Sequence, residues 1–307
     1  MASNFLQNAT DFAVNQLSLI TSGGTEIDLR NIVVEISFFE DIFSTVMSGK
    51  LLITDGHDLV SSFGIHGNEF LRMDIGKPSL SGLSFQRMFR IYKISDRKPS
   101  TESDTGQTYV IHFCSQELIT SQSYIVSKSY KNMKHKDMVL DICNNYLQIP
   151  GLDTSLFEDT SGLYSLIIPA MRPLEAINFI CSRAYNGTSN YAYFFFETRQ
   201  NYNFKSLQGM FKSPVYNEYL YDNKRVNPQP SADYKSINEL RINNDCDVIS
   251  LLSNGAYASK LLTIDVKKQK YFANTYSEVD KQKNGLLMNQ YLPFNLFADN
   301  KKNALPD

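Results

Sequence analysis

The N-terminal third of the chain alternates apolar and polar positions with a period of two, the pattern of half-buried β-strands. In the clearest case Val34, Ile36 and Phe38 share one face of a strand. The turn-prone pair Asp55-Gly56 closes a second strand, and we expect the polar segment 95–108 to be an exposed loop. The strands predicted in this way cover residues 32–38, 50–54, 89–94 and 109–114. With no strong helix between them, they predict an antiparallel barrel or sandwich.

The middle third changes to a helical period. Apolar residues at positions 138, 139, 142, 143 and 146 predict an amphipathic helix that ends before Pro150-Gly151. A second helix is expected to begin at Pro173 and to stop at Gly187. Its predicted apolar stripe consists of Leu174, Ile177, Cys181 and Ala184. A strand at 191–196, a turn at Gln200-Asn201 and a short strand at 202–204 complete a small α+β unit.

The strand at 191–196 is too continuously aromatic to expose one face to water. We expect it to be buried on both sides, either within its own domain or partly by a partner subunit. If it were left exposed, such a run would promote aggregation, so it favours obligate assembly.

The last third begins with a proline-containing, polar stretch at 212–230 that we interpret as a linker. Beyond it, strands are predicted at 237–242 and 256–265, and a short helix at 248–252. The remaining polar residues give no pattern of regular structure.

Composition narrows the class of protein. The 307 residues are 42% hydrophobic and include 18 Tyr and 20 Phe, too many apolar groups for a disordered chain. The length suggests about two domains of roughly 150 residues each. A formal net charge of −2 argues against a dedicated nucleic-acid binder, which gains its affinity by neutralising phosphates.

Cysteine usage and the N-terminus indicate a cytoplasmic origin. The four cysteines show no CxxC spacing and lie in apolar runs, so we expect buried free thiols in a reducing compartment. No basic residue precedes Arg30, as a secretory signal would require. No apolar run approaches the roughly 18 residues of a membrane-spanning helix, so no membrane-spanning segment is expected.

Signals of catalysis are weak, and we expect no metal ion or other cofactor. The sequence contains no phosphate-binding glycine loop, metalloprotease motif or nucleophile elbow. Asp55, Asp58 and Glu69 could act as a carboxylate pair for glycoside cleavage, although a turn-forming Asp also explains the first. His112 and Cys114 share a strand face, but no further ligand stands nearby to complete a metal site.

One local basic patch spans residues 128–136 and contains Lys128, Lys131, Lys134, His135 and Lys136. An acidic partner or nucleic acid could contact it. We favour the simpler interpretation, a solvated loop that leads into the helix at 138–146.

Several segments together resemble a known family. They include Ser48-Gly49-Lys50-Leu51-Leu52-Ile53-Thr54-Asp55-Gly56 and the runs 31–36, 63–71, 89–97, 109–117, 167–173, 183–184 and 193–206. In this order and spacing they resemble baseplate hub proteins of contractile-tailed bacteriophages, an architecture shared by the spike component of type VI secretion machines. The resemblance covers roughly residues 10–265, with gaps.

The resemblance implies a β-rich α+β fold with two tail-tube-like antiparallel β-barrels and an intervening α+β region. Residues 1–117 would form the first barrel, 118–212 the α+β region and 213–307 the second barrel. It further implies a homotrimer whose six barrels form a ring between the sixfold tail tube and the threefold spike.

The implied partners are the spike protein below, tail-tube or tube-initiator proteins above, and baseplate wedge proteins. Phage DNA would pass through the ring transiently. The protein would reside in the virion baseplate after assembly in the host cytoplasm, with no catalytic or cofactor-binding residue. The packing and interface candidates are Val34, Ile36, Phe38, Leu51, Ile53, Phe194, Phe196, Leu261 and Ile264. The alternatives are a tail-tube subunit and a hub-associated, lysozyme-like glycoside hydrolase.

Overall fold

The computed structural model describes residues 12–76, 85–99, 106–187, 192–215, 218–221, 236–237, 241, 248–253, 255 and 258–277. The chain divides into two compact units, one up to Ile237 and one from Asn238 onward. Each unit is considered separately below.

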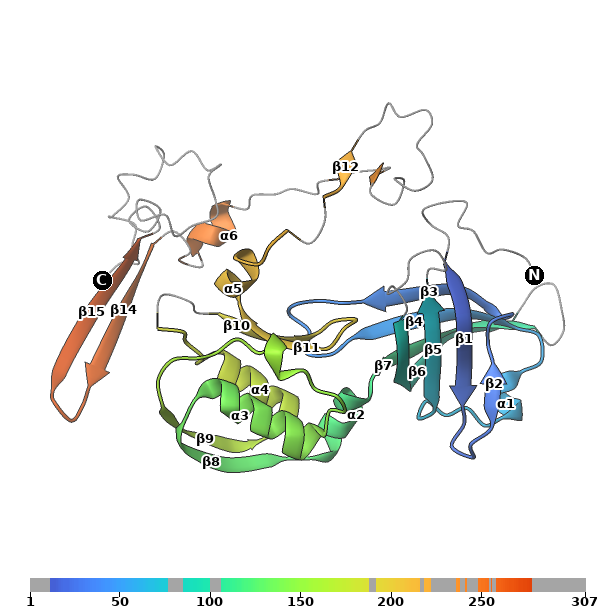
Figure 1. Cartoon of the computed structure of the whole chain (residues 1–307), viewed down its shortest axis with the longest axis horizontal. Coiled ribbons are helices and arrows are strands. Elements are labelled where there is room, and N and C mark those ends of the chain that lie inside the picture. The colour runs from blue at the N-terminus through green and yellow to red at the C-terminus, as the bar shows by residue number, and fades with distance from the viewer. Residues whose placement is uncertain are drawn as a thin grey trace. The chain divides into compact units, whose positions relative to one another are not determined.

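The first unit begins with a curled antiparallel sheet of seven strands, blue to teal in Figure 1. Its spatial order is β2-β1-β5-β6-β7-β4-β3, so β2 and β3 form its two edges. The short helix α1 (Leu59–Ser62) lies between β4 and β5. The strands are β1 (Ala13–Ile20), β2 (Glu26–Asp28), β3 (Val33–Phe39), β4 (Ser48–Asp55), β5 (Phe70–Gly76), β6 (Phe85–Pro99) and β7 (Gln107–Ser115).

The predicted period of two in the first third is confirmed where the sheet packs on its core. Tyr109, Ile111 and Phe113 of β7 are almost completely buried on one face. They pack with β4, whose pairing with β7 places Leu51 opposite Ile111. Antiparallel strands therefore build one side of the predicted barrel or sandwich, and the described residues form a curled open sheet.

The expected loop at 95–108 is wrong at both ends, because β6 continues to Pro99 and β7 begins at Gln107. Residues 100–105 of the expected loop lie outside the described residues. Ser95 pairs with Val110, and Pro99 pairs with Gln107. Two register shifts along β6 break the alternation of side chains, which hides this strand from a search for a period of two. Pro is tolerated at the end of the strand, since the ladder needs no further N–H donor there.

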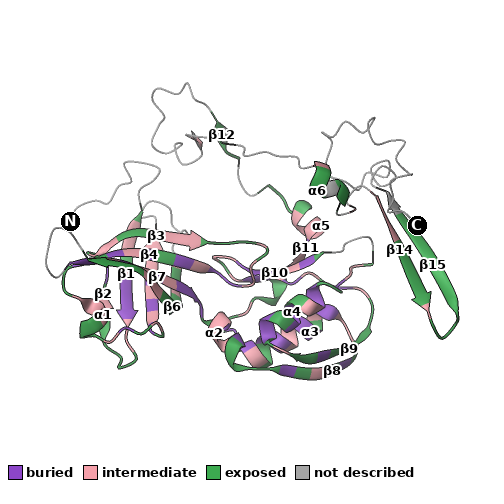
Figure 2. Ribbon diagram, turned by 180° about the vertical axis from the view of Figure 1, so that it is seen from behind, coloured by how far each residue is buried: buried purple, intermediate pink, exposed green. Residues whose placement is uncertain are grey.

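An α+β body follows the sheet and is also part of the first unit. Its helices pack against two-stranded sheets around a second core, seen as purple on α3 and α4 in Figure 2. Its elements are α2 (Gln116–Ser123), β8 (Val126–Met133), α3 (His135–Ile142), the π-helix η1 (Cys143–Leu147), the 3-10 helix η2 (Thr154–Leu156), β9 (Tyr164–Met171), α4 (Pro173–Cys181), β10 (Tyr193–Glu197), β11 (Tyr202–Ser206) and α5 (Leu207–Phe211).

Both predicted helices of this body are confirmed. The helix predicted at 138–146 is α3 continued by η1, and α4 begins at Pro173 as expected. Leu174, Ile177 and Cys181 of the predicted stripe are buried on α4, and Ala184, the fourth member, is buried just after the helix. The helix ends at Cys181, well before Gly187, so the predicted stop is wrong. The backbone turns at Ser182, whose N–H donates to the carbonyl of Asn178.

Residues 128–133 of the segment that we interpreted as a solvated basic loop belong to the strand β8, which pairs with β9, and residues 135–136 begin α3. Val126 and Tyr130 of β8 face the core, whereas Lys128 is half-buried and Lys131 is exposed. The high lysine content concealed a strand that buries only every fourth residue.

Beyond residue 215, the described residues of the first unit form β12 (Leu220–Tyr221) and β13 (Ser236–Ile237), which pair in parallel. Much of the linker predicted at 212–230, and of the strand predicted at 237–242, lies outside the described residues. The second unit contains α6 (Val248–Ser253), as predicted at 248–252, and a hairpin of β14 (Ala258–Asp265) and β15 (Lys270–Ser277). The second barrel over 213–307 stays a prediction. Within the described residues, no helix is long and apolar enough to span a bilayer.

Candidate functional site

The carboxylate of Asp55 stabilises the turn after β4. It is buried, and its two oxygens accept the backbone N–H groups of His57 at 2.8 Å and Leu59 at 2.6 Å. The hydroxyl of Tyr109 donates to the same carboxylate at 3.3 Å, and burial is the main reason why the pKa of this tyrosine is raised. Asp55 thus has the contacts of a turn-forming residue.

The carboxylates of Glu69 and Asp58 also accept hydrogen bonds from nearby groups of the chain. The buried Glu69 accepts backbone N–H groups from three successive residues, 66–68, at 2.8–3.0 Å. The half-buried Asp58 accepts from Arg97 at 2.8 Å and caps α1 through Ser61, and hydrogen bonds lower its pKa. Both oxygens of Asp55 and Glu69, and the Oδ1 atom of Asp58, are therefore already engaged with their own chain.

The strand pairing places His112 and Cys114 on the same face of β7, as the spacing predicted. The Cys114 thiol is completely buried, which raises its pKa to about 12. His112 shares a 2.8 Å hydrogen bond with Ser95, and burial followed by the charge of Lys93 lowers its pKa. No group of three metal-ligating side chains occurs among the described residues.

Two of the four lysines in the basic patch at 128–136 form ion pairs within the α+β body. Lys128 pairs with Asp141 at 2.7 Å, and Lys134 pairs with Asp159 at 2.8 Å. His135 is buried against the ring of Tyr164, 4.4 Å between centroids.

The packing and interface candidates on the first sheet fall into two groups, those in its core and one exposed residue. Leu51 and Ile53 are fully buried in its core, and Ile36 and Phe38 pack against that core while half-buried. Val34 is 64% exposed beside an irregularity in the pairing of β3 with β4. It therefore lies on the edge strand, available for contact.

The aromatic strand β10 is covered on both sides within its own chain. Phe196 is buried, and Tyr193 and Phe195 lie in the core of the α+β body. Phe194 makes an edge-to-face contact with Phe43, which follows β3 in the sequence, at 5.5 Å between ring centroids. Phe43 itself is 75% exposed.

The packing and interface candidates in the second unit are exposed on the hairpin of β14 and β15. Leu261 and Ile264 on β14 are 63% and 72% exposed, and Phe272 and Tyr271 on β15 are also exposed. A two-stranded hairpin with so much apolar surface is marginally stable alone, so this element needs a further contact.

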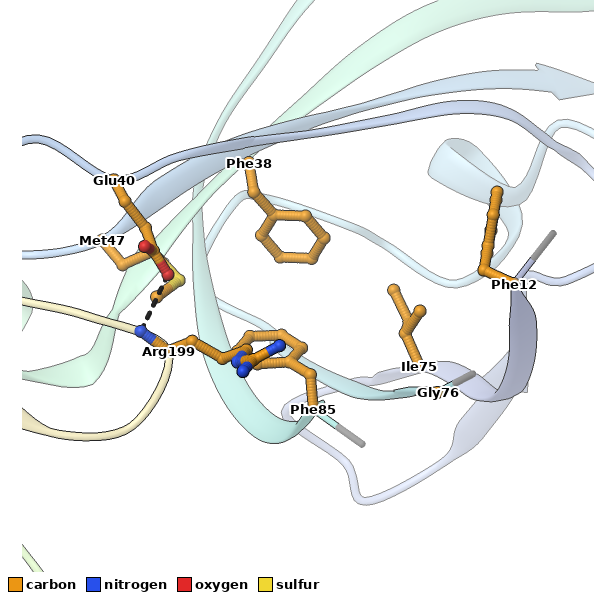
Figure 3. A pocket seen from close by; sticks show the side chains of 8 residues that line it. All are labelled: Phe12, Phe38, Glu40, Met47, Ile75, Gly76, Phe85 and Arg199. Atoms are coloured by element: carbon orange, nitrogen blue, oxygen red, sulfur yellow. Dashed lines mark hydrogen bonds between the residues drawn. The ribbon is translucent and has the colours of Figure 1, made fainter. Parts of the chain in front are cut away.

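A cavity of about 310 Å³ opens at one end of the first sheet, as Figure 3 shows. Phe12, Phe38, Ile75 and Phe85 provide its apolar wall. At its rim Glu40 accepts the backbone N–H of Arg199 at 2.8 Å, a contact between the sheet and the α+β body. The sequence offered no signal for this cavity, because its walls come from distant strands.

A buried ion pair joins the sheet to the α+β body. The side chain of Glu197 on β10 is fully buried and pairs with Arg87 on β6. It also accepts the N–H of Met47 at 2.8 Å and the hydroxyl of Ser115. These partners lie up to 150 positions apart, so no local pattern could reveal the junction.

A second cavity of about 510 Å³ lies beside this junction and is here called the junction cleft. Its walls are formed by β5 and β6, the start of α2, the segment 147–151 at the end of the π-helix, and the turn into β11. Glu117 and Arg87 are its charged lining residues. The sequence patterns gave no indication of either residue.

Comparisons with known proteins give only distant likenesses. No protein-family model matches the chain, and no curated protein matches it. The tail protein from Neisseria meningitidis MC58 is 13% identical with a TM-score of 0.44, over 69% of this chain and 56% of that one. The 43 kDa tail protein of prophage MuSo2 from Shewanella oneidensis is 12% identical with a TM-score of 0.39, over 62% and 54%.

A component of the type VI secretion system of E. coli is 12% identical with a TM-score of 0.36, over 64% of this chain and 46% of that one. The chain thus spans about half the length of these three solved structures. TM-scores below 0.5 do not establish a shared fold, so nothing about the role of this chain follows from these likenesses.

Proposed function

We propose that this chain is a structural protein of a contractile phage tail, the baseplate hub that joins the sixfold tail tube to the threefold spike. As a homotrimer it binds the spike below and tail-tube or tube-initiator proteins above, with wedge proteins around it. It assembles in the host cytoplasm, resides in the virion baseplate and lets phage DNA pass. It acts mechanically, without a catalytic residue or cofactor.

The observation that carries the proposal beyond the ordered sequence resemblance is the open edge of the first sheet. No described strand pairs with the outer side of β3. Val34 and Phe39 on this strand are 64% and 48% exposed. A long apolar edge strand is a hazard unless another chain covers it. Pairing with the neighbouring subunit would cover β3 and continue the sheet around a ring.

The junction between the sheet and the α+β body supports a mechanical role. The fully buried Glu197 binds groups from three strands of the sheet or their ends, through Arg87, Met47 and Ser115. Such a charge network holds one geometry firmly, because each partner removed leaves a buried group unsatisfied. A hub that transmits contraction needs rigid coupling of this kind.

The glycoside hydrolase alternative has less support. Asp55 and Glu69 direct both oxygens at backbone N–H groups, and Asp58 caps a helix. We expect no cell-wall cleavage by the purified protein. Activity that disappears in D55N, D58N or E69Q would overturn the structural assignment.

Light scattering on the purified full chain tests the proposal. We expect a particle of three times 35.0 kDa, either alone or after addition of its spike. Val34→Glu places a charge on the open edge and should yield monomers with an unchanged circular dichroism spectrum. Ile167→Glu on β9, where the native side chain is 71% exposed, is the matched control and should remain trimeric. A hexamer would favour the tail-tube alternative, and trimers of V34E would exclude pairing through β3.

A further inference from the structure

The face of the first sheet that points away from its core carries a row of basic side chains. His112 on β7 belongs to this outer face, because it alternates with the buried Ile111 and Phe113. It lies opposite Lys50 on β4 and opposite Lys93 on β6. The three side chains therefore stand next to one another on adjacent strands, which are roughly 4.8 Å apart. Both lysines are exposed and form no ion pair with a described residue.

Exposed aromatic rings stand at the two ends of this row. Tyr92 is the extra residue where the register of β6 shifts, is 45% exposed, and has its ring centroid 6.0 Å from that of His112. Phe39 on β3 is 48% exposed, and the Nζ atom of Lys50 lies 5.7 Å from its ring centroid. Since β4 and β7 separate β3 from β6, the two rings are about three strand spacings apart, roughly 14 Å.

A third cation, Arg90, lies in the next row along the same face. It pairs with Cys114, two positions after His112 on β7. Its guanidinium lies over the ring of Phe70, 4.2 Å from the centroid, and forms no ion pair with a described residue. A guanidinium plane in this position is itself a surface on which a nucleic-acid base can stack.

The two carboxylates near the row do not neutralise it. Glu35 accepts the hydroxyl of Ser37 at 2.8 Å, and Asp96 accepts the hydroxyl of Ser95 at 2.9 Å. Neither forms an ion pair in the part of the chain that the structure describes. Burial lowers the pKa of His112, and the charges of the two lysines lower it further, against a smaller opposite effect of Asp96. The lysines therefore dominate the electrostatic surroundings of the imidazole.

We propose that this outer face binds single-stranded nucleic acid. It is here called the cationic face and consists of Phe39, Lys50, Arg90, Tyr92, Lys93 and His112. The lysines contact phosphates, and unpaired bases stack on the exposed rings of Tyr92 and Phe39. These rings favour nucleic acid over an acidic protein segment, which would use the cations alone. With so few cations in a chain of net charge −2, the binding is weak and sensitive to salt.

The proposal does not depend on the tail assignment, because it uses only the face of the sheet and leaves the backbone edge of β3 free. The full chain is titrated at low salt into a labelled oligothymidylate of about 12 nucleotides, within the roughly 4–16 that a stacking surface of this kind covers. Fluorescence anisotropy measures the binding. We expect saturation, weaker binding of a duplex of the same length, and a slope of log Kd against log salt of about 0.7 per phosphate neutralised.

Variants separate the phosphate contacts from the stacking. Lys50→Gln and Lys93→Gln should each lower the salt slope by about 0.7. Tyr92→Ala should weaken binding about fivefold or more and leave the slope unchanged, because stacking releases no counter-ions. The matched controls are Lys131→Gln, at an exposed lysine on β8, and Tyr124→Ala, at a tyrosine that is 47% exposed. Both should bind like the wild type, and circular dichroism checks that every variant is folded.

Three results would overturn the proposal. The first is the absence of saturable binding at low salt, and the second is an equal loss of binding in the control variants. The third is displacement of the oligonucleotide by poly-glutamate at the same concentration of charge. That displacement would assign the cationic face to an acidic protein segment instead.

Discussion

Removing the arginine of the buried junction should destabilise the protein strongly. In Arg87→Met a side chain of similar length loses its charge, and Glu197, whose side chain is fully buried, keeps two hydrogen-bond donors but no counter-ion. Breaking a buried pair from one side costs about 3–5 kcal/mol. Since small domains are stable by only about 5–15 kcal/mol, this is a large fraction of the total.

The double variant separates charge from packing. Glu197→Gln alone should cost less, about 1–3 kcal/mol, because Arg87 is 23% exposed and can turn toward water. The combination R87M/E197Q leaves no buried charge and should be more stable than R87M, with a coupling energy of about 2 kcal/mol.

Urea unfolding followed by circular dichroism measures each of these losses. Arg72→Met breaks the more exposed pair of Arg72 with Glu26 and is the matched control, with a small expected effect. If R87M loses less than about 1 kcal/mol, or if the double variant is no more stable than R87M, the junction does not hold the two parts together as argued.

Three further predictions follow from the packing and the charges. Gly49→Ala puts a Cβ 2.2 Å from the ring of Phe113 and 2.5 Å from the Ser37 carbonyl oxygen. Thermal unfolding should therefore show that the free energy of unfolding falls by about 3 kcal/mol or more. Gly56→Ala, with open space around its Cβ, is the control and should change little. Asp141→Asn should destabilise the protein at pH 7. Burial raises the pKa of Asp141, but hydrogen bonds from Lys128 and Tyr130 outweigh burial and lower the pKa, so the carboxylate stabilises the fold above about pH 4 and loses this effect as the pH falls below it. An equal loss of stability at pH 2 and pH 7 would contradict this assignment. Glu117→Gln should be more stable than the wild type at pH 7, because the raised pKa of Glu117 makes its ionised form costly in the folded state. This advantage should vanish below about pH 4, where the wild-type carboxyl is protonated. A difference in urea midpoints that does not change with pH would show that ionisation of Glu117 is not its cause.

The sequence predicted those strands and helices whose buried side chains keep a regular period. β4, β7, α3 and α4 are of this kind. The strand β1 was not predicted, because Leu17, Ser18 and Leu19 are buried in succession and its two faces therefore do not differ in polarity. β6 is longer than its pattern because of its register shifts, which turn consecutive side chains to unexpected faces.

The candidate sites were harder to predict for a different reason. Asp55 could be read from the sequence as a turn residue, because its partners lie within four positions. Glu117 and Glu197 could not, since their surroundings are assembled from strands and helices far apart in the chain. Their unusual feature is burial of a charge, and burial at such positions depends on tertiary packing.

We propose that three copies of this chain close a ring through the edges of their sheets. Electron microscopy of the purified protein with its spike tests it most directly. We expect threefold particles in which six barrel-like densities surround a channel wide enough for DNA. Stable monomers that form no ring, even in the presence of the spike and tube proteins, would contradict it.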